Sequence, residues 1–248
     1  QLSPMSMKVA LLKDFCSSPL SICRSLERKE LIELFKKENE ISTKGLSFEP
    51  VEKKIDFNKD QSNVIKAINN SLGKKQFNSH LLHGVTGSGK TEIFIEVIKT
   101  VIKKNETAIV LLPEISLTPQ IAGRFKSVFP GKIALWHSQL TKAQRDSTWE
   151  KIHNGIYDIV IGARSAIFTP LKNVGLIIID EEQDSSYKQE SPSPRYHARD
   201  VAIVRAKFEN ANILLSSATP SLESFYNSKN NKYKYLNLPN RYGEASYP

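Results

Sequence analysis

Residues 81–98 of the chain read LLHGVTGSGKTEIFIEVI. An apolar segment typical of a buried strand runs into three glycines within six residues, at Gly84, Gly87 and Gly89, and a lysine and a threonine follow. Glycine lets the backbone curl so that successive N–H groups point at one anion. A helix that begins near Thr91 would add its positive N-terminal end. The stretch therefore predicts a phosphate-binding loop between a strand and a helix.

Residues 84–91 fit the pattern G-x-x-x-x-G-K-[ST] at every position, and this pattern is the signature of loops that bind nucleoside triphosphates. Lys90 is expected to reach the β- and γ-phosphates, and the hydroxyl of Thr91 is expected to bind Mg²⁺. An ordinary glycine-rich turn is the alternative, but it requires neither the strand before the loop nor the helix after it. The loop residues expected to bind ATP are Gly84, Val85, Thr86, Gly87, Ser88, Gly89, Lys90 and Thr91.

An acidic partner for this loop lies in VGLIIIDEEQ, residues 174–183, where an apolar segment ends in carboxylates. We expect Asp180 to hold Mg²⁺ and Glu181 to orient or deprotonate the attacking water. Glu182 is a less certain third member. Adjacent carboxylates by themselves usually mark a solvated turn, but here they follow an apolar strand in a chain with a phosphate loop. The predicted catalytic residues are Lys90, Asp180 and Glu181, and the predicted metal ligands are Thr91 and Asp180.

From residue 57 onward, short continuous apolar runs alternate with segments of helical character. Continuous rather than alternating runs are typical of strands that are buried on both faces of a parallel sheet. The pattern predicts an α/β fold of the P-loop type, with a mostly parallel sheet, helices on both faces, and ligands at the carboxyl ends of the strands. The expected strands lie in 80–84, 107–113, 133–137, 158–163, 174–182 and 212–219, and the expected helices in 91–104, 118–128, 141–153 and 198–208.

The chain before this region has a different pattern. Residues 1–40 indicate short helices, and a polar stretch with β-favouring residues follows. Two or three helices followed by a β element would suit a small winged-helix module. We therefore divide the chain into a winged-helix-like domain with its linker, residues 1–50, and a nucleotide-binding lobe, residues 51–248.

The composition favours an anionic partner. Lys and Arg number 35 against 26 Asp and Glu, which gives a formal net charge of +9 and a pI of about 9.4. Such a balance favours nucleic acid over a membrane surface, although it could serve solubility alone. Two cysteines, Cys16 and Cys23, can form neither a disulfide framework nor a complete zinc site. No apolar run reaches the ~20 residues of a membrane span, and no signal peptide is apparent. We expect a cytoplasmic protein, and a first residue other than Met suggests an excised fragment.

A second cluster follows the carboxylates. Tyr187, Lys188, Arg195, Tyr196 and His197 lie within eleven residues. Aromatic faces stack on unpaired bases and cations contact phosphates, so this loop is a candidate for binding DNA. The alternative is a surface loop whose tyrosines pack onto the domain.

Six ordered blocks together resemble the first motor lobe of the replication-restart helicases, which are superfamily 2 DNA helicases. The blocks are GVTGSGKTE, PEISLTPQ, GARSAIF, DEEQDSSYKQ, YHARD and SSATPSLES. The resemblance covers about residues 57–240, and residues 1–50 resemble the winged-helix domain of that family more loosely. It implies a RecA-like lobe of an enzyme that hydrolyses ATP, travels 3′ to 5′ and loads at stalled forks during primosome assembly.

The resemblance also assigns roles residue by residue. Gln61 matches the glutamine that contacts adenine, although a single Gln is by itself more often a helix surface residue. Two segments of the family that touch the DNA strand match residues 113–120 and 162–165. The family's motif III, which couples the nucleotide state to DNA binding, matches residues 217–219. The aromatic-rich loop after the acidic box is implied to sense DNA. The residues implied in DNA binding or coupling are Pro113, Glu114, Thr118, Gln120, Arg164, Ser165, Gln183, Tyr187, Lys188, Arg195, Tyr196, His197, Ser217 and Thr219.

One position departs from the family. Its acidic box is usually Asp-Glu-Glu-His, and Gln183 stands here in place of the histidine. Glutamine can form a hydrogen bond to motif III but cannot take a proton near neutrality. We therefore expect the contact to survive and any titrating role to be lost.

The family implies further parts beyond this sequence: a second lobe with an arginine that stabilises the transferring phosphate, and zinc-binding cysteines. A fragment without them is expected to bind ATP weakly and hydrolyse it hardly at all. The implied partners are forked or single-stranded DNA, the single-stranded-DNA-binding protein and primosome proteins. Three alternatives remain: a P-loop ATPase that moves no nucleic acid, a non-catalytic DNA-binding module with a relic nucleotide site, and another superfamily 2 translocase.

Overall fold

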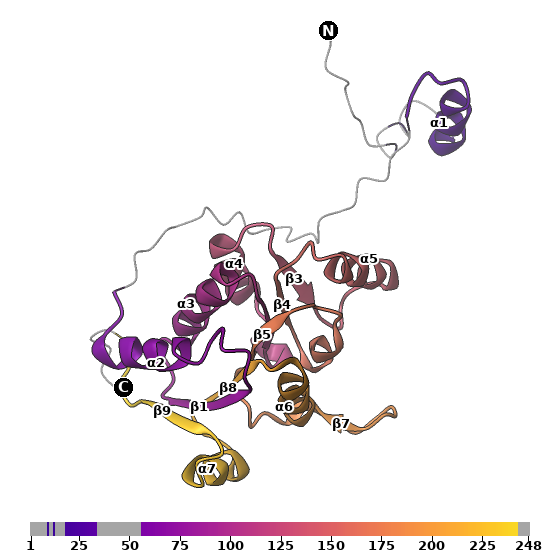
Figure 1. Cartoon of the computed structure of the whole chain (residues 1–248). Coiled ribbons are helices and arrows are strands. Elements are labelled where there is room, and N and C mark those ends of the chain that lie inside the picture. The colour runs from indigo at the N-terminus through magenta and orange to yellow at the C-terminus, as the bar shows by residue number, and fades with distance from the viewer. Residues whose placement is uncertain (1–8, 10–11, 13–17, 34–55, 243–248) are drawn as a thin grey trace. The chain divides into compact units, whose positions relative to one another are not determined.

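A parallel sheet of seven strands, in the order β3-β4-β2-β5-β8-β1-β9, organises the larger part of the chain in the computed structural model (Figure 1). The structure describes residues 9, 12, 18–33 and 56–242. Every neighbouring pair in the sheet is parallel. The strands are β1 (Asn78–Gly84), β2 (Thr107–Leu111), β3 (Ile133–Trp136), β4 (Ile159–Gly162), β5 (Val174–Ile179), β8 (Asn212–Ser217) and β9 (Lys234–Leu238).

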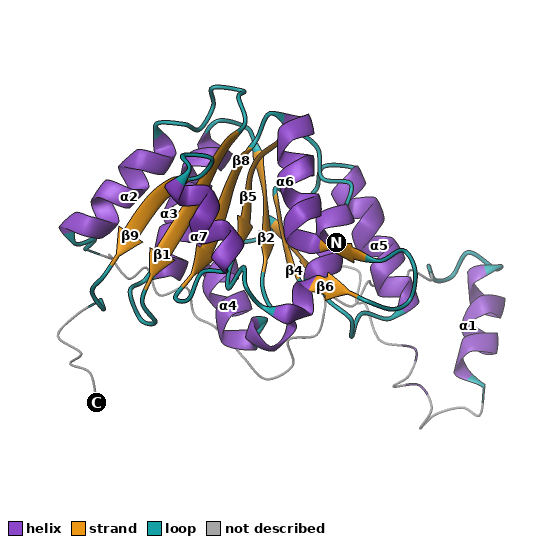
Figure 2. Cartoon of the chain, turned by 90° about the horizontal axis from the view of Figure 1, so that it is seen from below, coloured by secondary structure: helices purple, strands orange, loops and turns teal. Residues whose placement is uncertain are grey.

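Helices cover both faces of this sheet (Figure 2). Leu82, Val110 and Leu214 point to one face and share a core with α2, α3 and α4. Their neighbours along the strands point to the other face, because side chains alternate along a strand, and Leu81 and Ile213 are fully buried there. The predicted α/β fold class is confirmed. The helices of this part are α2 (Lys59–Asn69), α3 (Lys90–Lys103), α4 (Pro119–Val128), α5 (Lys142–His153), α6 (Ala198–Glu209) and α7 (Leu222–Lys229).

The strand register brings the predicted motifs to one edge. Leu81, Leu215 and Ile179 are aligned across β1, β8 and β5. The phosphate loop follows β1 and the acidic box follows β5, so both leave the sheet at its carboxyl edge, on either side of β8. Parallel strands bind ligands at this edge.

All six predicted strands and all four predicted helices are present. The sequence reading missed α2, α7 and β9. β9 was missed because it is an edge strand in which only Leu236 and Leu238 are buried, so it lacks the continuous apolar run that we used to recognise strands. A two-stranded antiparallel ribbon, β6 (Lys188–Gln189) and β7 (Tyr196–His197), carries the aromatic-rich loop.

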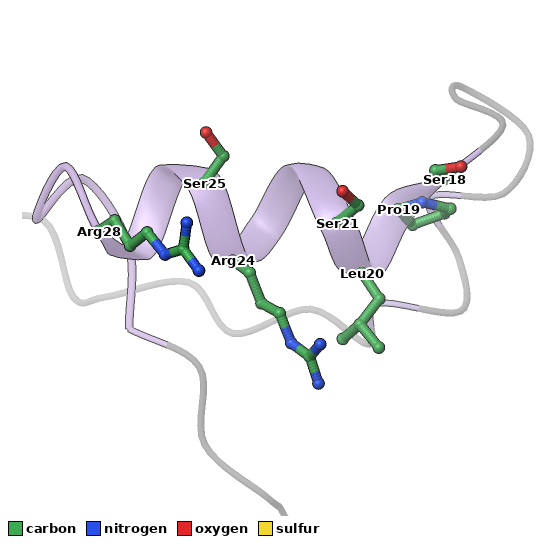
Figure 3. A pocket seen from close by; sticks show the side chains of 7 residues that line it. All are labelled: Ser18, Pro19, Leu20, Ser21, Arg24, Ser25 and Arg28. Carbon is green, nitrogen blue, oxygen red and sulfur yellow. The ribbon is translucent and has the colours of Figure 1, made fainter.

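The chain divides into two compact units, residues 1–42 and residues 43–248. The first unit contains α1 (Pro19–Glu27). Side chains of this helix, among them Arg24, line an open pocket together with Arg28, which follows the helix (Figure 3). Most of the predicted winged-helix domain lies outside the described residues, so that domain and its boundary at residue 50 stay predictions. In the parts of the chain that the structure describes, every helix is too short or too polar to cross a lipid bilayer.

Candidate nucleotide site and nucleic-acid surface

The phosphate loop is a tight connection between β1 and α3. Gly87 and Gly89 have φ values of +79° and +81°, in the left-handed region that favours glycine. The N–H of Ser88 donates to the carbonyl of Val85 at 3.1 Å, which closes the turn, and α3 begins at Lys90. The backbone therefore has the curled form and helix start from which such loops bind phosphate.

Lys90 joins this loop to the acidic box. Its ammonium group donates to the carbonyl of Gly84 at 3.0 Å and lies 3.5 Å from a carboxylate oxygen of Glu181. The Lys90 side chain is only 10% exposed, and that of Glu181 is 31% exposed. The structure thus brings these two predicted catalytic residues together, Lys90 from the start of α3 and Glu181 from the loop after β5.

Asp180 lies directly after β5, and one of its carboxylate oxygens accepts a hydrogen bond from the Ser216 hydroxyl at 3.1 Å. Burial, and then the negative charge of Glu181, raise the pKa of Asp180 to about 6 against the opposing effect of Lys90. A bound cation would relieve this cost of keeping a buried carboxylate charged.

The donor set fits Mg²⁺, since the Asp180 carboxylate and the Thr91 hydroxyl are hard oxygen ligands. Mg²⁺ usually takes one or two protein ligands and completes its shell with water and phosphate oxygens. Among the described residues, no three His, Cys, Asp or Glu side chains gather as a metal site by themselves.

Glu181 occupies an unusual backbone position, with φ at +45° in the left-handed region. Non-glycine residues held there are strained and are concentrated at functional sites. The side-chain amide of Gln183 donates to the second carboxylate oxygen of Glu181 at 3.0 Å. This side chain therefore hydrogen-bonds within the box, and among the described residues Asp180 and Glu182 contact the region of motif III, at Ser216 and Ser221.

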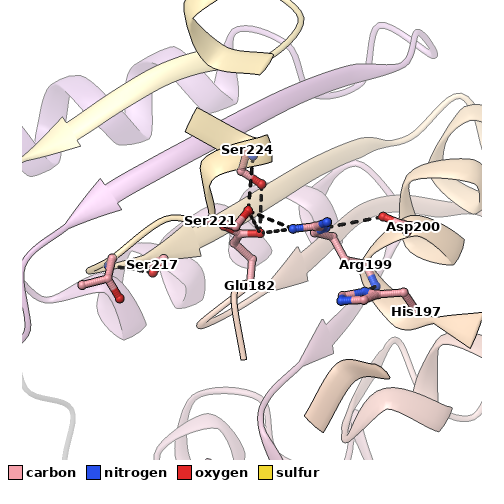
Figure 4. A network of polar contacts seen from close by, with 8 residues as sticks. Glu182, His197, Arg199, Asp200, Ser217, Ser221 and Ser224 are labelled. Carbon is pink, nitrogen blue, oxygen red and sulfur yellow. Dashed lines mark hydrogen bonds and ion pairs between the residues drawn. The ribbon is translucent and has the colours of Figure 1, made fainter. Parts of the chain in front are cut away.

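Glu182 is fully buried and lies at the centre of a network of polar contacts (Figure 4). One carboxylate oxygen accepts from the Ser221 N–H at 2.7 Å. The other accepts from Arg199 at 2.9 Å, Ser224 at 2.9 Å and the Ser221 hydroxyl at 3.2 Å. Glu182 therefore clamps the acidic box to the start of α6 and to the segment that follows residues 217–219.

Tyr187 lies inside the lobe, and the expectation that it stacks on bases is wrong for this structure. Its ring is fully buried. Its hydroxyl donates to the carbonyl of Asp180 at 2.6 Å and is 3.1 Å from the carbonyl of Leu111, at the end of β2. Burial raises the pKa of Tyr187, so the hydroxyl keeps its proton. The alternative, a tyrosine packed onto the domain, holds at this position.

The rest of the aromatic-rich loop is divided between anchored and exposed side chains. Arg164 donates to the carbonyls of Ser186 and Lys188 at 3.3 and 3.1 Å, so it holds the loop in place. Tyr196 packs edge-on against Phe168, with 5.0 Å between ring centroids. His197 caps α6 by accepting from a backbone N–H. Exposed cations remain at Lys188, which pairs with Glu190, and Arg195.

The segments expected to touch the DNA strand lie at the same carboxyl edge. Residues 113–120 leave β2 through a 3-10 helix, η2 (Glu114–Ser116), and enter α4 at Pro119, with Thr118 as the N-cap. Glu114 accepts from the Ser138 hydroxyl, and Ser165 accepts from Trp136 at 3.2 Å in η3 (Arg164–Phe168). Gln120 is exposed. Their contacts with DNA stay predictions.

Motif III is held from the phosphate-loop side. Ser217 is buried, and its hydroxyl accepts from the Thr219 N–H at 2.8 Å. The imidazole of His83, the residue before Gly84, contacts the Ala218 carbonyl at 3.2 Å and the Tyr235 hydroxyl at 2.7 Å. Nothing in the sequence pointed to His83, whereas a hydroxyl beside motif III could have pointed to Ser216.

Gln61 is buried rather than on a helix surface. It forms a capping box with Asn58 at the start of α2, and its amide donates to the Ser88 carbonyl at 2.9 Å. It therefore braces the phosphate loop, and its contact with adenine stays a prediction.

Residues 58–227 match the DEAD/DEAH box helicase family. The chain is 47% identical over 189 residues to the replication restart protein PriA of Bacillus subtilis, covering 76% of this chain and 23% of that protein. It is 49% identical over 195 residues to the PriA of Haemophilus influenzae, covering 79% and 26%. The chain thus spans about a quarter of the length of these relatives.

Solved structures agree on the fold alone. The chain is similar to RecG bound to a three-way DNA junction, with a TM-score of 0.58 and 20% identity over 78% of this chain and 25% of RecG. It is similar to the helicase MrfA bound to DNA, with a TM-score of 0.56 and 16% identity over 77% and 27%. With a match that takes in the phosphate loop, the acidic box and motif III, the chain belongs to the DEAD/DEAH box helicase family.

Proposed function

We propose that residues 51–248 form the first motor lobe of an ATP-dependent DNA helicase that acts in replication restart. The observation that carries this proposal is the approach of Lys90 to Glu181, 3.5 Å apart, with the raised-pKa carboxylate of Asp180 beside them. A relic site would have no reason to keep a phosphate-binding lysine next to two carboxylates at the end of a buried strand.

Each residue has a distinct task in ATP hydrolysis. Lys90 exchanges its contact with the Gly84 carbonyl for the β- and γ-phosphates, and Glu181 orients water for attack. Thr91 and Asp180 would hold Mg²⁺, which when bound neutralises negative charge on the phosphates. Gln183 keeps Glu181 in place through its hydrogen bond.

DNA would lie along the carboxyl edge, over residues 113–120, Arg164 and the cations Lys188 and Arg195. Arg164 also holds the loop that contains Tyr187, and the Tyr187 hydroxyl holds the backbone of Asp180. A shift of Arg164 toward a phosphate would therefore reach the metal ligand through two hydrogen-bonded steps.

The remaining properties are implied by the resemblance, concern a longer protein and are proposals here. They are 3′-to-5′ unwinding, loading at stalled forks, partnership with the single-stranded-DNA-binding protein and primosome proteins, and a place in the bacterial cytoplasm at the nucleoid. The identity to PriA over the described lobe supports them.

Nucleotide titration tests the site directly. We expect Mg²⁺·ADP to bind the chain, and Lys90→Ala to weaken this binding at least about tenfold, because a lysine–phosphate contact contributes on the order of 1.5–3 kcal/mol. Lys99→Ala is the matched control, since Lys99 is an exposed lysine on the same helix. Equal affinities of the two variants would contradict the assignment.

A second measurement tests the motor. In the longer protein, forked DNA should stimulate ATP hydrolysis, and Glu181→Gln should abolish the hydrolysis while nucleotide and DNA still bind. DNA-independent hydrolysis, or hydrolysis that survives Glu181→Gln, would contradict a helicase with this catalytic residue.

A further inference from the structure

The chain after β9 runs back across the phosphate loop. The carbonyl of Leu238 accepts from the Val85 N–H at 3.2 Å, and the N–H of Tyr242 donates to the Gly87 carbonyl at 2.8 Å. These two backbone hydrogen bonds fix residues 238–242 alongside the loop that is proposed to hold the phosphates. No sequence motif marked this segment.

The Tyr242 side chain extends from the loop toward the start of α2. Its hydroxyl donates to the carbonyl of Asp56 at 3.2 Å, two residues before the N-cap Asn58. A Cβ placed at Gly89 would lie 2.5 Å from the amide nitrogen of Gln61 and 3.8 Å from the Cβ of Tyr242. Tyr242 and Gln61 thus converge on Gly89, and Tyr242 remains 44% exposed.

The amide of Gln61 is poorly placed to supply base affinity alone. It is 1% exposed, its oxygen accepts from Asn58 and its nitrogen donates to Ser88. A nucleotide whose phosphates lie on residues 84–91 needs a further surface for its base. An aromatic ring that is half exposed and fixed at its hydroxyl is such a surface, because bases stack on aromatic faces.

We propose that Tyr242 forms the base-side wall of the nucleotide site, with the adenine ring of the bound nucleotide stacked on its phenol ring. This inference rests on the proposed nucleotide-binding function. The hydrogen bond to Asp56 sets the orientation of the ring, and the backbone bond to Gly87 ties the position of the ring to the phosphate loop.

The test separates base from phosphate. Mg²⁺·ADP and Mg²⁺·pyrophosphate are titrated into the wild-type chain and into Tyr242→Ala, Tyr242→Phe and Tyr226→Ala. Removal of a stacking ring should weaken ADP roughly 5- to 150-fold in Tyr242→Ala and leave pyrophosphate unchanged. Tyr242→Phe keeps the ring but loses the hydrogen bond that orients it, so its affinity for ADP should lie between those of wild type and Tyr242→Ala. Tyr226 is an exposed tyrosine on α7, so Tyr226→Ala should change neither affinity.

Three results would overturn the inference while leaving the nucleotide site intact. They are an unchanged affinity of Tyr242→Ala for ADP, an equal loss for ADP and pyrophosphate, and a gain for both ligands, which would identify the segment as a lid over the loop. A wild-type chain that binds neither ligand would overturn the nucleotide site and the wall together. Unchanged pyrophosphate binding also shows that Tyr242→Ala is folded.

Discussion

Replacing Glu182 by alanine should destabilise the motor lobe more than any change at its neighbour Glu181. Glu182→Ala removes the acceptor of four hydrogen bonds in a fully buried site. Breaking a buried ion pair by removing one partner costs about 3–5 kcal/mol, because the other charge is left without its partner. Arg199 still has Asp200 at 3.4 Å and the Ser221 hydroxyl at 2.9 Å, so we expect a loss near the lower end, about 3 kcal/mol.

Urea unfolding followed by tryptophan fluorescence measures this loss. Both tryptophans of the chain, Trp136 and Trp149, lie in the lobe, with their rings 5.8 Å apart. The midpoint should fall with the slope unchanged, as expected for a change in stability alone. Glu181→Gln is the control, and as a partly exposed position it should stay within about 0.5 kcal/mol of wild type.

A double-mutant cycle with Arg199→Met isolates the pair. Once the guanidinium is gone, no unpaired cation remains after loss of Glu182, so the double variant should lose about 0.5–3 kcal/mol less than the sum of the single losses. A loss below about 1 kcal/mol for Glu182→Ala, or additive effects in the cycle, would refute the clamp.

The remaining predictions concern the loop, the metal ligand and the glycines. Tyr187→Phe should lower the free energy of unfolding by about 1 kcal/mol in the same urea assay, because it removes a buried hydrogen-bonding hydroxyl. It should leave the affinity for DNA unchanged, because the ring does not stack on bases. A large loss of DNA affinity would restore the stacking role. Asp180 has a folded-state pKa raised to about 6 from 3.8, so the folded state binds more protons between these values. The contribution of Asp180 to the free energy of unfolding is therefore fully present below pH 4 and is lost as pH rises through about 6. The affinity for Mg²⁺·ADP should increase over the same range. An affinity that does not depend on pH between pH 5 and 7 would argue against Asp180 as a ligand. Gly89→Ala should weaken nucleotide binding, because the new Cβ lies 2.5 Å from the amide nitrogen of Gln61 and displaces the side chain that braces the loop. Gly131→Ala, also at positive φ but with no atom within 4 Å, should show only the backbone strain of about 1–2 kcal/mol.

Much of the lobe could be predicted from the sequence, because its main signals are local. A continuous apolar run such as residues 174–179 is typical of a strand in the middle of a parallel sheet, where both faces are buried. The phosphate loop is similarly local, since glycines at 87 and 89 are required by the backbone itself. For the same reason, the strands and helices that lack such a signal were missed, as β9 was.

What the sequence could not predict are contacts made across long distances in the chain. Tyr187 belongs to an aromatic and basic loop, and its composition favours stacking on DNA. Only the fold shows that its hydroxyl reaches a carbonyl of Asp180 and that its ring is buried. Tyr242 is likewise an ordinary residue of a polar segment until the sheet places that segment over Gly87.

The acidic box shows why neighbouring carboxylates take different roles. The left-handed backbone of Glu181, with φ at +45°, turns the chain sharply between Asp180 and Glu182. Asp180 remains at the edge of the sheet, where the Ser216 hydroxyl and the backbone N–H of Glu181 donate to its carboxylate, and its raised pKa leaves it with capacity for a cation. Glu182 turns inward, where it is fully buried and accepts four hydrogen bonds from Arg199, Ser221 and Ser224. The kink therefore separates a carboxylate available for metal from one committed to structure, and Glu181, at the kink itself, is left facing Lys90.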